Sequence, residues 1–178
     1  MKYLVVLVIL ALGCGTLIGS SGPVDTKSES YRVADLSKES SEWEKVAPAK
    51  DSTPSTATSD VAYKSKANSS VIFVNSGCRP KNKSIGKSTE EDLRSLTDPL
   101  FMGAAEVLVR KEEPRVVQGA SALQTNFAGR IGDERVMIRA VVFRLQTCVY
   151  YLVYTASPQA FEAGEKTFAY FVSSFQGR

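Results

Sequence analysis

The chain of 178 residues has a net charge of +3, and 43% of its residues are hydrophobic while 23% are charged. This composition is typical of a globular protein with one sizeable core, and its mild basicity, without a groove-reading motif, excludes a dedicated nucleic-acid binder. The sequence contains no histidine, which removes histidine-based catalytic triads, the usual zinc sites and the commonest general base. We therefore expect no metal, no cofactor and no nucleic-acid partner.

The first predicted element is an apolar segment that follows a positively charged N-terminal residue. Lys2 precedes an apolar run from Tyr3 to Leu12, which is too short for a membrane-spanning helix because such a helix needs about 20 apolar residues. The run is therefore interpreted as a secretory signal. Its end, LALGC at residues 10–14, resembles the bacterial lipobox, although Ala11 stands where leucine is more usual.

The lipobox resemblance implies a domain organisation with three parts. Residues 1–13 would be a signal peptide, Cys14 would carry diacylglycerol, and residues 14–30, rich in Gly, Ser and Thr, would form a tether for a domain at 31–178. We expect lipid at Cys14 to hold the protein in the bacterial cell envelope. By the same resemblance Gly15, which is not aspartate, favours the outer membrane and a periplasm-facing domain. The alternative is an ordinary cleaved signal with a chance cysteine.

The middle of the chain predicts strands followed by a helix. We expect the fold to begin at residues 31–33, and strands at 61–66 and 69–76, separated by a turn. Ser88 and Glu91 match a capping box at the start of a helix, and Asp98-Pro99 begins a second helical segment that continues through residues 104–105. The single tryptophan, Trp43, is predicted to be an anchor in the core or at a sheet edge.

The rest of the chain predicts four strands and a helix. The strands are expected within residues 106–119, 121–129, 134–145 and 148–155. The segment at 134–145 is apolar on both faces, which indicates a central strand covered on both sides. Ser157 and Pro158 are predicted to start a helix that continues to Phe175. Its buried stripe comprises Phe161, Phe168, Phe171, Val172 and Phe175.

Two cysteines other than Cys14, namely Cys78 and Cys148, flank strand-like segments. An even pair in an exported protein favours a disulfide, and two neighbouring strand ends would bring the sulfur atoms together. The alternative is a reactive thiol pair, although the C-x-x-C spacing of redox enzymes is absent.

Short links between neighbouring strands require a mostly antiparallel sheet, and the helices can cover it, so the predicted fold is an α+β sandwich. From about Asp60 to the end, the chain resembles the PsbP/Mog-type domain, in particular that of small bacterial lipoproteins. The segments that carry the resemblance are AYKSKANSSVIFVNSGCR, ALQTNFAGRIGD, CVYYLVYTASPQAFEAG and FAYFVSSF. It implies an assembly factor, a binding module or a protein with no known activity, rather than an enzyme. Photosystem-type members use histidine-containing metal contacts, which this chain lacks.

Two groups of side chains are candidate binding residues. The first is a cationic run suited to an anionic lipid headgroup or an acidic partner, or simply a solvated loop: Arg79, Lys81, Lys83 and Lys87. The second is an aromatic group that would line a sheet–helix groove, or else be plain core: Tyr150, Tyr154, Phe168 and Phe171.

No catalytic set emerges from the sequence, because there is no G-x-S-x-G motif and no histidine base. The leading hypothesis is therefore a non-catalytic, lipid-anchored envelope protein that acts as a protein-binding or assembly module. The alternative is a binder of a small amphiphile in the sheet–helix groove, and a hydrolase that uses serine and carboxylates is a third hypothesis.

Overall fold

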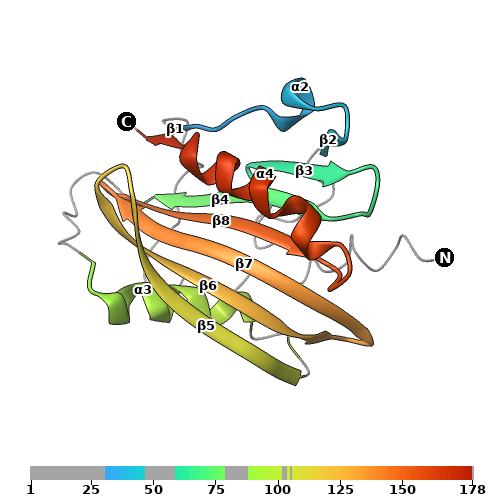
Figure 1. Ribbon diagram of the computed structural model, residues 1–178. Helices are drawn as coiled ribbons and strands as arrows, with labels where there is room; N and C mark the ends of the chain where they lie inside the picture. Colours follow the sequence, from blue (N-terminus) through green and yellow to red (C-terminus); the bar gives the residue numbers. More distant parts are fainter. Residues whose placement is uncertain (1–30, 47–58, 79–87, 102–103, 105, 178) are drawn as a thin grey trace.

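The computed structural model describes residues 31–46, 59–78, 88–101, 104 and 106–177. These residues form an antiparallel sheet of seven strands, with helix α4 (Phe161–Ser173) on one face and helices α3 (Glu90–Thr97) and η1 (Asp98–Phe101) on the other (Figure 1). The strand order is β2-β3-β4-β8-β7-β6-β5. The strands are β2 (Trp43–Val46), β3 (Val61–Ser65), β4 (Val71–Cys78), β5 (Glu106–Val117), β6 (Ala120–Ile131), β7 (Glu134–Leu145) and β8 (Cys148–Ala156). The predicted α+β sandwich with a mostly antiparallel sheet is confirmed.

Strand β7 shows how the sequence pattern builds two cores. Side chains alternate between the faces of a strand, so Val141 and Phe143 pack in the core beneath α4. Ile138 and Val142 join the core beneath α3 and η1 on the other face. The prediction of a central strand covered on both sides is confirmed.

The helix α3 (Glu90–Thr97) begins one residue later than the sequence predicts. Its capping box joins Thr89 and Asp92 rather than Ser88 and Glu91: Asp92 N donates to Thr89 Oγ1 at 3.1 Å, and Thr89 N donates to Asp92 Oδ2 at 2.9 Å. The pattern of Ser or Thr followed three residues later by an acid occurs in both registers, so spacing alone does not separate them. The following η1 (Asp98–Phe101) ends where Phe101 stacks on Phe127, and the predicted continuation through residues 104–105 falls partly outside the described residues.

The helix α4 (Phe161–Ser173) also begins later than predicted. Ser157 does not cap it, because residues 157–160 form a turn in which Ala160 N donates to Ser157 O at 3.0 Å. The start of the helix is held instead by Tyr154 of β8, whose hydroxyl donates to the carbonyls of Ala160 at 3.2 Å and Phe161 at 2.8 Å. The predicted apolar stripe is confirmed: Phe161, Phe168, Phe171 and Phe175 are buried and Val172 is partly buried against the same core.

The two ends of the described chain meet on the α4 side of the sheet (Figure 1). The short strand β1 (Tyr31–Arg32) pairs with β9 (Gln176–Gly177), and the Tyr31 ring stacks on Phe175 with 5.6 Å between centroids. Helix α2 (Leu36–Glu39) follows, and Leu36 is buried. Trp43 lies buried in the edge strand β2, as predicted.

The disulfide between Cys78 and Cys148 is present. The two cysteines are directly opposite one another in the antiparallel pair of β4 and β8. The bond therefore joins segments 70 residues apart in the sequence across neighbouring strands of the same sheet, and the predicted disulfide is confirmed.

Candidate ligand-binding site

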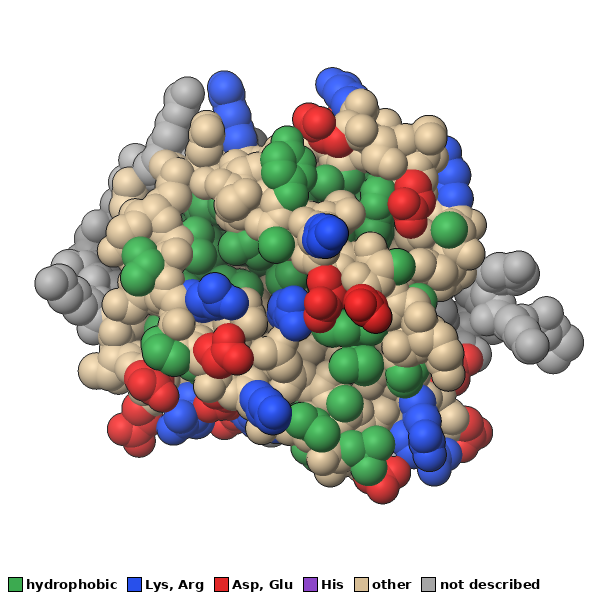
Figure 2. All heavy atoms as spheres, viewed as in Figure 1, with side chains coloured by type: hydrophobic (Ala, Val, Ile, Leu, Met, Phe, Trp, Pro, Cys, Tyr) green, Lys and Arg blue, Asp and Glu red, His purple; other side chains and the backbone are tan. Residues whose placement is uncertain are grey.

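A pocket of about 360 Å³ lies between α4 and strands β5, β6 and β7. Figure 2 shows this face of the molecule, where hydrophobic side chains form the floor of a hollow that has cationic side chains beside it. The volume falls near the lower end of the range for small-molecule sites, which is about 300–1,000 Å³. The residues that line it are Arg115, Val116, Val117, Gln118, Gln124, Arg139, Val141, Phe168, Ala169, Val172, Ser173 and Phe175.

The pocket exists because β5 and β6 extend beside α4 rather than beneath it. The two strands are joined by a two-residue turn at Gln118 and Gly119, whose φ angles of 49° and 77° fit a type I′ hairpin. This turn brings the end of β5 beside the second half of α4, and Gln118 is held there by Gly177 N, which donates to its Oε1 at 2.8 Å.

The floor and one wall of the pocket are apolar. Val117, Val141, Phe168 and Phe175 are all buried and belong to the core beneath α4. A ligand in the pocket would therefore place apolar groups against side chains that the fold already fixes, so these side chains would lose little conformational freedom on binding.

The polar part of the site centres on Arg139 of β7. Its Nη2 donates to Glu165 of α4 at 2.8 Å, its Nε donates to Asn126 at 2.6 Å, and its guanidinium lies over the Phe161 ring at 5.5 Å. The guanidinium is thereby fixed between the sheet and the helix.

Gln124 and Arg115 are two further polar residues of the lining. Gln124 is only 8% exposed, and its Nε2 is 3.5 Å from Glu113 Oε2, longer than the usual 2.9–3.0 Å for such a bond. The Arg115 side chain is 54% exposed and its Nη2 is 3.8 Å from the same carboxylate oxygen, beyond the distance of a charge-assisted hydrogen bond. These two side chains are thus weakly held.

The structure brings only one of the four aromatic candidates to the pocket. Phe168 lines it, whereas Tyr150, Tyr154 and Phe171 lie wholly within the core beneath α4. The reason is geometric: the tyrosines point from the central strand β8 toward α4, and the helix covers that part of the sheet. A groove does lie between sheet and helix, but farther along the sheet, over β5 to β7.

The remaining predicted site residues lie outside the described part of the chain. They are the lipidation candidate Cys14 and the cationic run of Arg79, Lys81, Lys83 and Lys87.

Sequence reasoning missed Arg115, Gln124 and Arg139 as site residues. The sequence did contain a signal for Arg139. On the α4-facing side of β7, this arginine is a charged residue between two apolar ones, Met137 and Val141. The other two lie on different strands, and nothing in the sequence shows that the register places them together.

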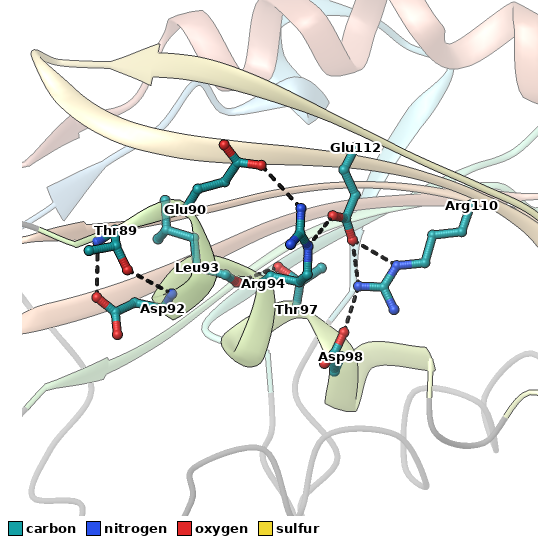
Figure 3. A network of polar contacts seen from close by, with 9 residues as sticks. All are labelled: Thr89, Glu90, Asp92, Leu93, Arg94, Thr97, Asp98, Arg110 and Glu112. Atoms are coloured by element: carbon teal, nitrogen blue, oxygen red, sulfur yellow. Dashed lines mark hydrogen bonds and ion pairs between the residues drawn. The ribbon is translucent and has the colours of Figure 1, made fainter.

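A second polar cluster lies on the opposite face of the sheet and fastens α3 and η1 to β5 (Figure 3). Glu112 accepts from Arg94 Nε at 2.6 Å and from Arg110 Nε at 2.8 Å. Arg110 also reaches Asp98 at 2.6 Å, and Arg94 reaches Glu90 at 3.1 Å. Each guanidinium is shared between carboxylates, which identifies this cluster as a structural brace.

The brace predicts a loss of stability in acid. Burial acts to raise the pKa of Glu112, and the hydrogen bonds from Arg94 and Arg110 outweigh it, so the pKa lies below the usual 4.5. The ionised Glu112 therefore contributes fully to the free energy of unfolding at a pH well above 4.5. This contribution is lost as the pH falls through the lowered pKa of the folded state. We expect Glu112→Gln to cost roughly 1–2 kcal/mol at neutral pH and to flatten the fall in unfolding free energy below pH 4.5, measured by urea denaturation across pH.

The matched control for this prediction is Glu113→Gln. Glu113 is the next residue of β5 and points to the other face, where its side chain is 53% exposed and its ion pair with Arg115 is long. We expect a change within about 0.5 kcal/mol. Equal effects of the two substitutions would contradict the role of Glu112 in the brace.

Comparison with solved structures shows which fold this is. The chain matches the solution structure of the cyanobacterial PsbP protein CyanoP from Synechocystis sp. PCC 6803 with a TM-score of 0.53 and 16% identity, covering 90% of this chain and 99% of that one. The fold is of the PsbP type. PA94 from Pseudomonas aeruginosa, a protein of unknown function, matches with a TM-score of 0.50 and 13% identity over 88% of this chain and 89% of that one. Comparison of the sequence with protein families and with curated proteins finds no match.

The predicted resemblance to the PsbP/Mog type is thus confirmed for the fold, and identities this low carry no function with it. Among the described residues, no helix combines the length and apolar character needed to span a bilayer. The described residues also contain no group of three or more Cys, Asp or Glu side chains arranged to hold a metal ion.

Proposed function

We propose that this protein is a non-catalytic, lipid-anchored binding protein of the bacterial cell envelope, and that it holds a small amphiphile between α4 and strands β5–β7. The observation that carries the proposal is the pocket itself, which combines a buried apolar floor with polar side chains that include Arg115, Gln124 and Arg139. An apolar pocket with a few convergent polar groups is the usual form of a small-molecule site. The resemblance of residues 10–14 to a bacterial lipobox supports the envelope location.

The proposal is tested with the protein purified gently from the membranes of its own host. Native mass spectrometry should show a bound small molecule in addition to the polypeptide and its acyl groups. The variant Ala169→Trp places a large ring at the pocket, because Ala169 lies on its α4 wall, and we expect this variant to carry no ligand.

The control is Ala163→Trp, at a solvent-exposed position of α4 away from the pocket lining, which should keep the ligand. Wild-type protein that is always ligand-free, or equal loading of the two variants, would overturn the proposal.

A protein partner is a second candidate function, favoured by the outer edge of the sheet. Three successive apolar residues of the edge strand β5 are exposed, namely Val107, Leu108 and Val109, and a bulge interrupts the strand there. Farther along, Pro114 lacks an N–H and charged residues surround it, which limits strand addition. Cross-linking in membranes should enrich the same envelope protein with wild type but not with Leu108→Lys.

A further inference from the structure

The charge around the pocket points to the kind of amphiphile that it accepts. Within the described structure, the charged residues that line the pocket are two arginines, Arg115 and Arg139. Their acidic partners, Glu113 and Glu165, are not part of the lining. The lining therefore presents guanidinium groups to a ligand, and the carboxylate that pairs with each of them lies outside the lining.

The strand register places the two arginines on either side of one buried amide. Gln124 pairs with Glu113 on β5 and with Val141 on β7. Arg115 lies two residues after Glu113 on β5, and Arg139 lies two residues before Val141 on β7. Both arginines are therefore diagonal neighbours of Gln124, one toward each end of β6. Diagonal neighbours on one face of a sheet are about 7–8 Å apart, within reach of long side chains.

Hydrogen bonding at the three residues leaves capacity for an anion. A guanidinium has five N–H donors, and the contacts of Arg139 with Asn126 and Glu165 engage Nε and Nη2. Gln124 is more than nine-tenths buried, and within the described part of the chain its amide makes only the long contact with Glu113. A buried amide normally has a good partner, and an oxyanion between the arginines would supply one.

The apolar side chains continue from this polar group toward the hairpin end of β5. Phe168, Val172 and Phe175 come from α4 and the residues that follow it, and Val117 faces them from β5. The volume of about 360 Å³ suits one chain rather than two.

We propose that the ligand is a single-chain amphiphile with an anionic headgroup, a carboxylate or a phosphate monoester, bound by Gln124, Arg115 and Arg139 with its tail against Phe168, Val172 and Phe175. This inference rests on the proposed function of the pocket and adds the sign of the headgroup. Arginine pairs with both oxyanions through parallel hydrogen bonds, so the two headgroups are separate arms of the test.

The experiment is isothermal titration calorimetry of the full-length mature protein, freed of any co-purified ligand, with four probes of equal chain length. Each ionic probe is kept below its critical micelle concentration, and dodecanol is kept below its solubility limit. The probes are dodecanoate, dodecyl phosphate, dodecanol and dodecyltrimethylammonium. We expect one or both anions to bind at least tenfold more tightly than dodecanol, and the cation to bind more weakly than dodecanol. Comparison of dodecanoate with dodecyl phosphate then identifies the headgroup.

Two substitutions separate the headgroup contact from the pocket. Arg115→Gln should weaken binding of the preferred anion about tenfold and leave the affinity for dodecanol unchanged. Gln124→Leu should also weaken binding of the preferred anion. The control Lys111→Gln removes an exposed cation from the same face of β5, outside the pocket lining, and should change neither affinity. A circular dichroism melt of each variant verifies that it is folded.

The outcomes distinguish this inference from the proposed function. If all four probes bind equally and Ala169→Trp abolishes binding, the pocket holds amphiphiles and the anionic preference is wrong. If no probe binds the folded wild type, both proposals fail. If Arg115→Gln and Lys111→Gln lose the same anion affinity, the preference for anions comes from the overall charge of the surface and not from the pocket, and the inference is overturned.

Discussion

Removal of the cross-link in the double variant Cys78→Ala/Cys148→Ala should lower the free energy of unfolding by about 4 kcal/mol. In the chain-entropy account, a disulfide stabilises the folded state by restricting the unfolded chain, and the effect grows with the length of the closed loop. Here the bond joins residues 70 positions apart. Since small domains are stable by only about 5–15 kcal/mol, this loss is a large share of the total.

Urea denaturation of wild type and double variant measures the effect. The slope of unfolding free energy against urea should also rise, because an unfolded chain without the cross-link exposes more surface. The near-ultraviolet spectrum of the folded state should be retained, since β4 and β8 are paired along eight residue pairs, from Val71 with Thr155 to Cys78 with Cys148. A change below about 1 kcal/mol would show that the bond is not a major source of stability.

Substitution of Gly164 by valine should destabilise the fold by about 3 kcal/mol or more. Gly164 lies on the buried side of α4 against the ring of Tyr154, and a Cβ at this position would be 2.5 Å from ring carbon Cζ and 2.8 Å from Cε2. Replacing a helical glycine normally gains up to about 1 kcal/mol. Overpacking against a rigid ring costs typically 1–3 kcal/mol, and here the Tyr154 hydroxyl also loses its bonds to Ala160 and Phe161.

The control for Gly164 is Ala163→Val, which adds a branched side chain at the preceding, exposed position of the same helix. We expect a cost of about 0.5 kcal/mol from helix propensity alone. Thermal unfolding of both variants gives the comparison, and the prediction is contradicted if Gly164→Val unfolds within a few degrees of Ala163→Val.

Strands were predictable where a local pattern decides the structure. Residues 134–145 were predicted and observed as one strand with the same bounds, because apolar side chains on both faces over 12 residues fit a covered central strand. The start of α4 was not predictable in the same way. Ser157 and Pro158 form a good local start signal, and the helix begins at Phe161 because Tyr154, on the preceding strand, holds the carbonyls there.

The pocket depended on information that the sequence does not display. The alternative that the aromatic residues are plain core holds for Tyr150 and Tyr154, which α4 covers, whereas Phe168 also lines the pocket. The sequence pattern does not separate these two outcomes. Arg115 and Arg139 lie on strands separated by β6, and only the register shows that they flank Gln124. Long-range strand pairing, rather than composition, creates the site.

The pairing of β1 with β9 has a consequence for how ligand would reach the pocket. Tyr31, where the described domain begins, contacts Phe175, and Gly177 bonds to Gln118; both Phe175 and Gln118 line the pocket. In a chain anchored at Cys14, the tether would thus join the domain at the pocket's own end. A flexible linker as long as residues 14–30 spans about 20–25 Å on average. The membrane would then act as a reservoir with a high effective concentration of amphiphile at the pocket, so that even weak intrinsic affinity would suffice for occupancy.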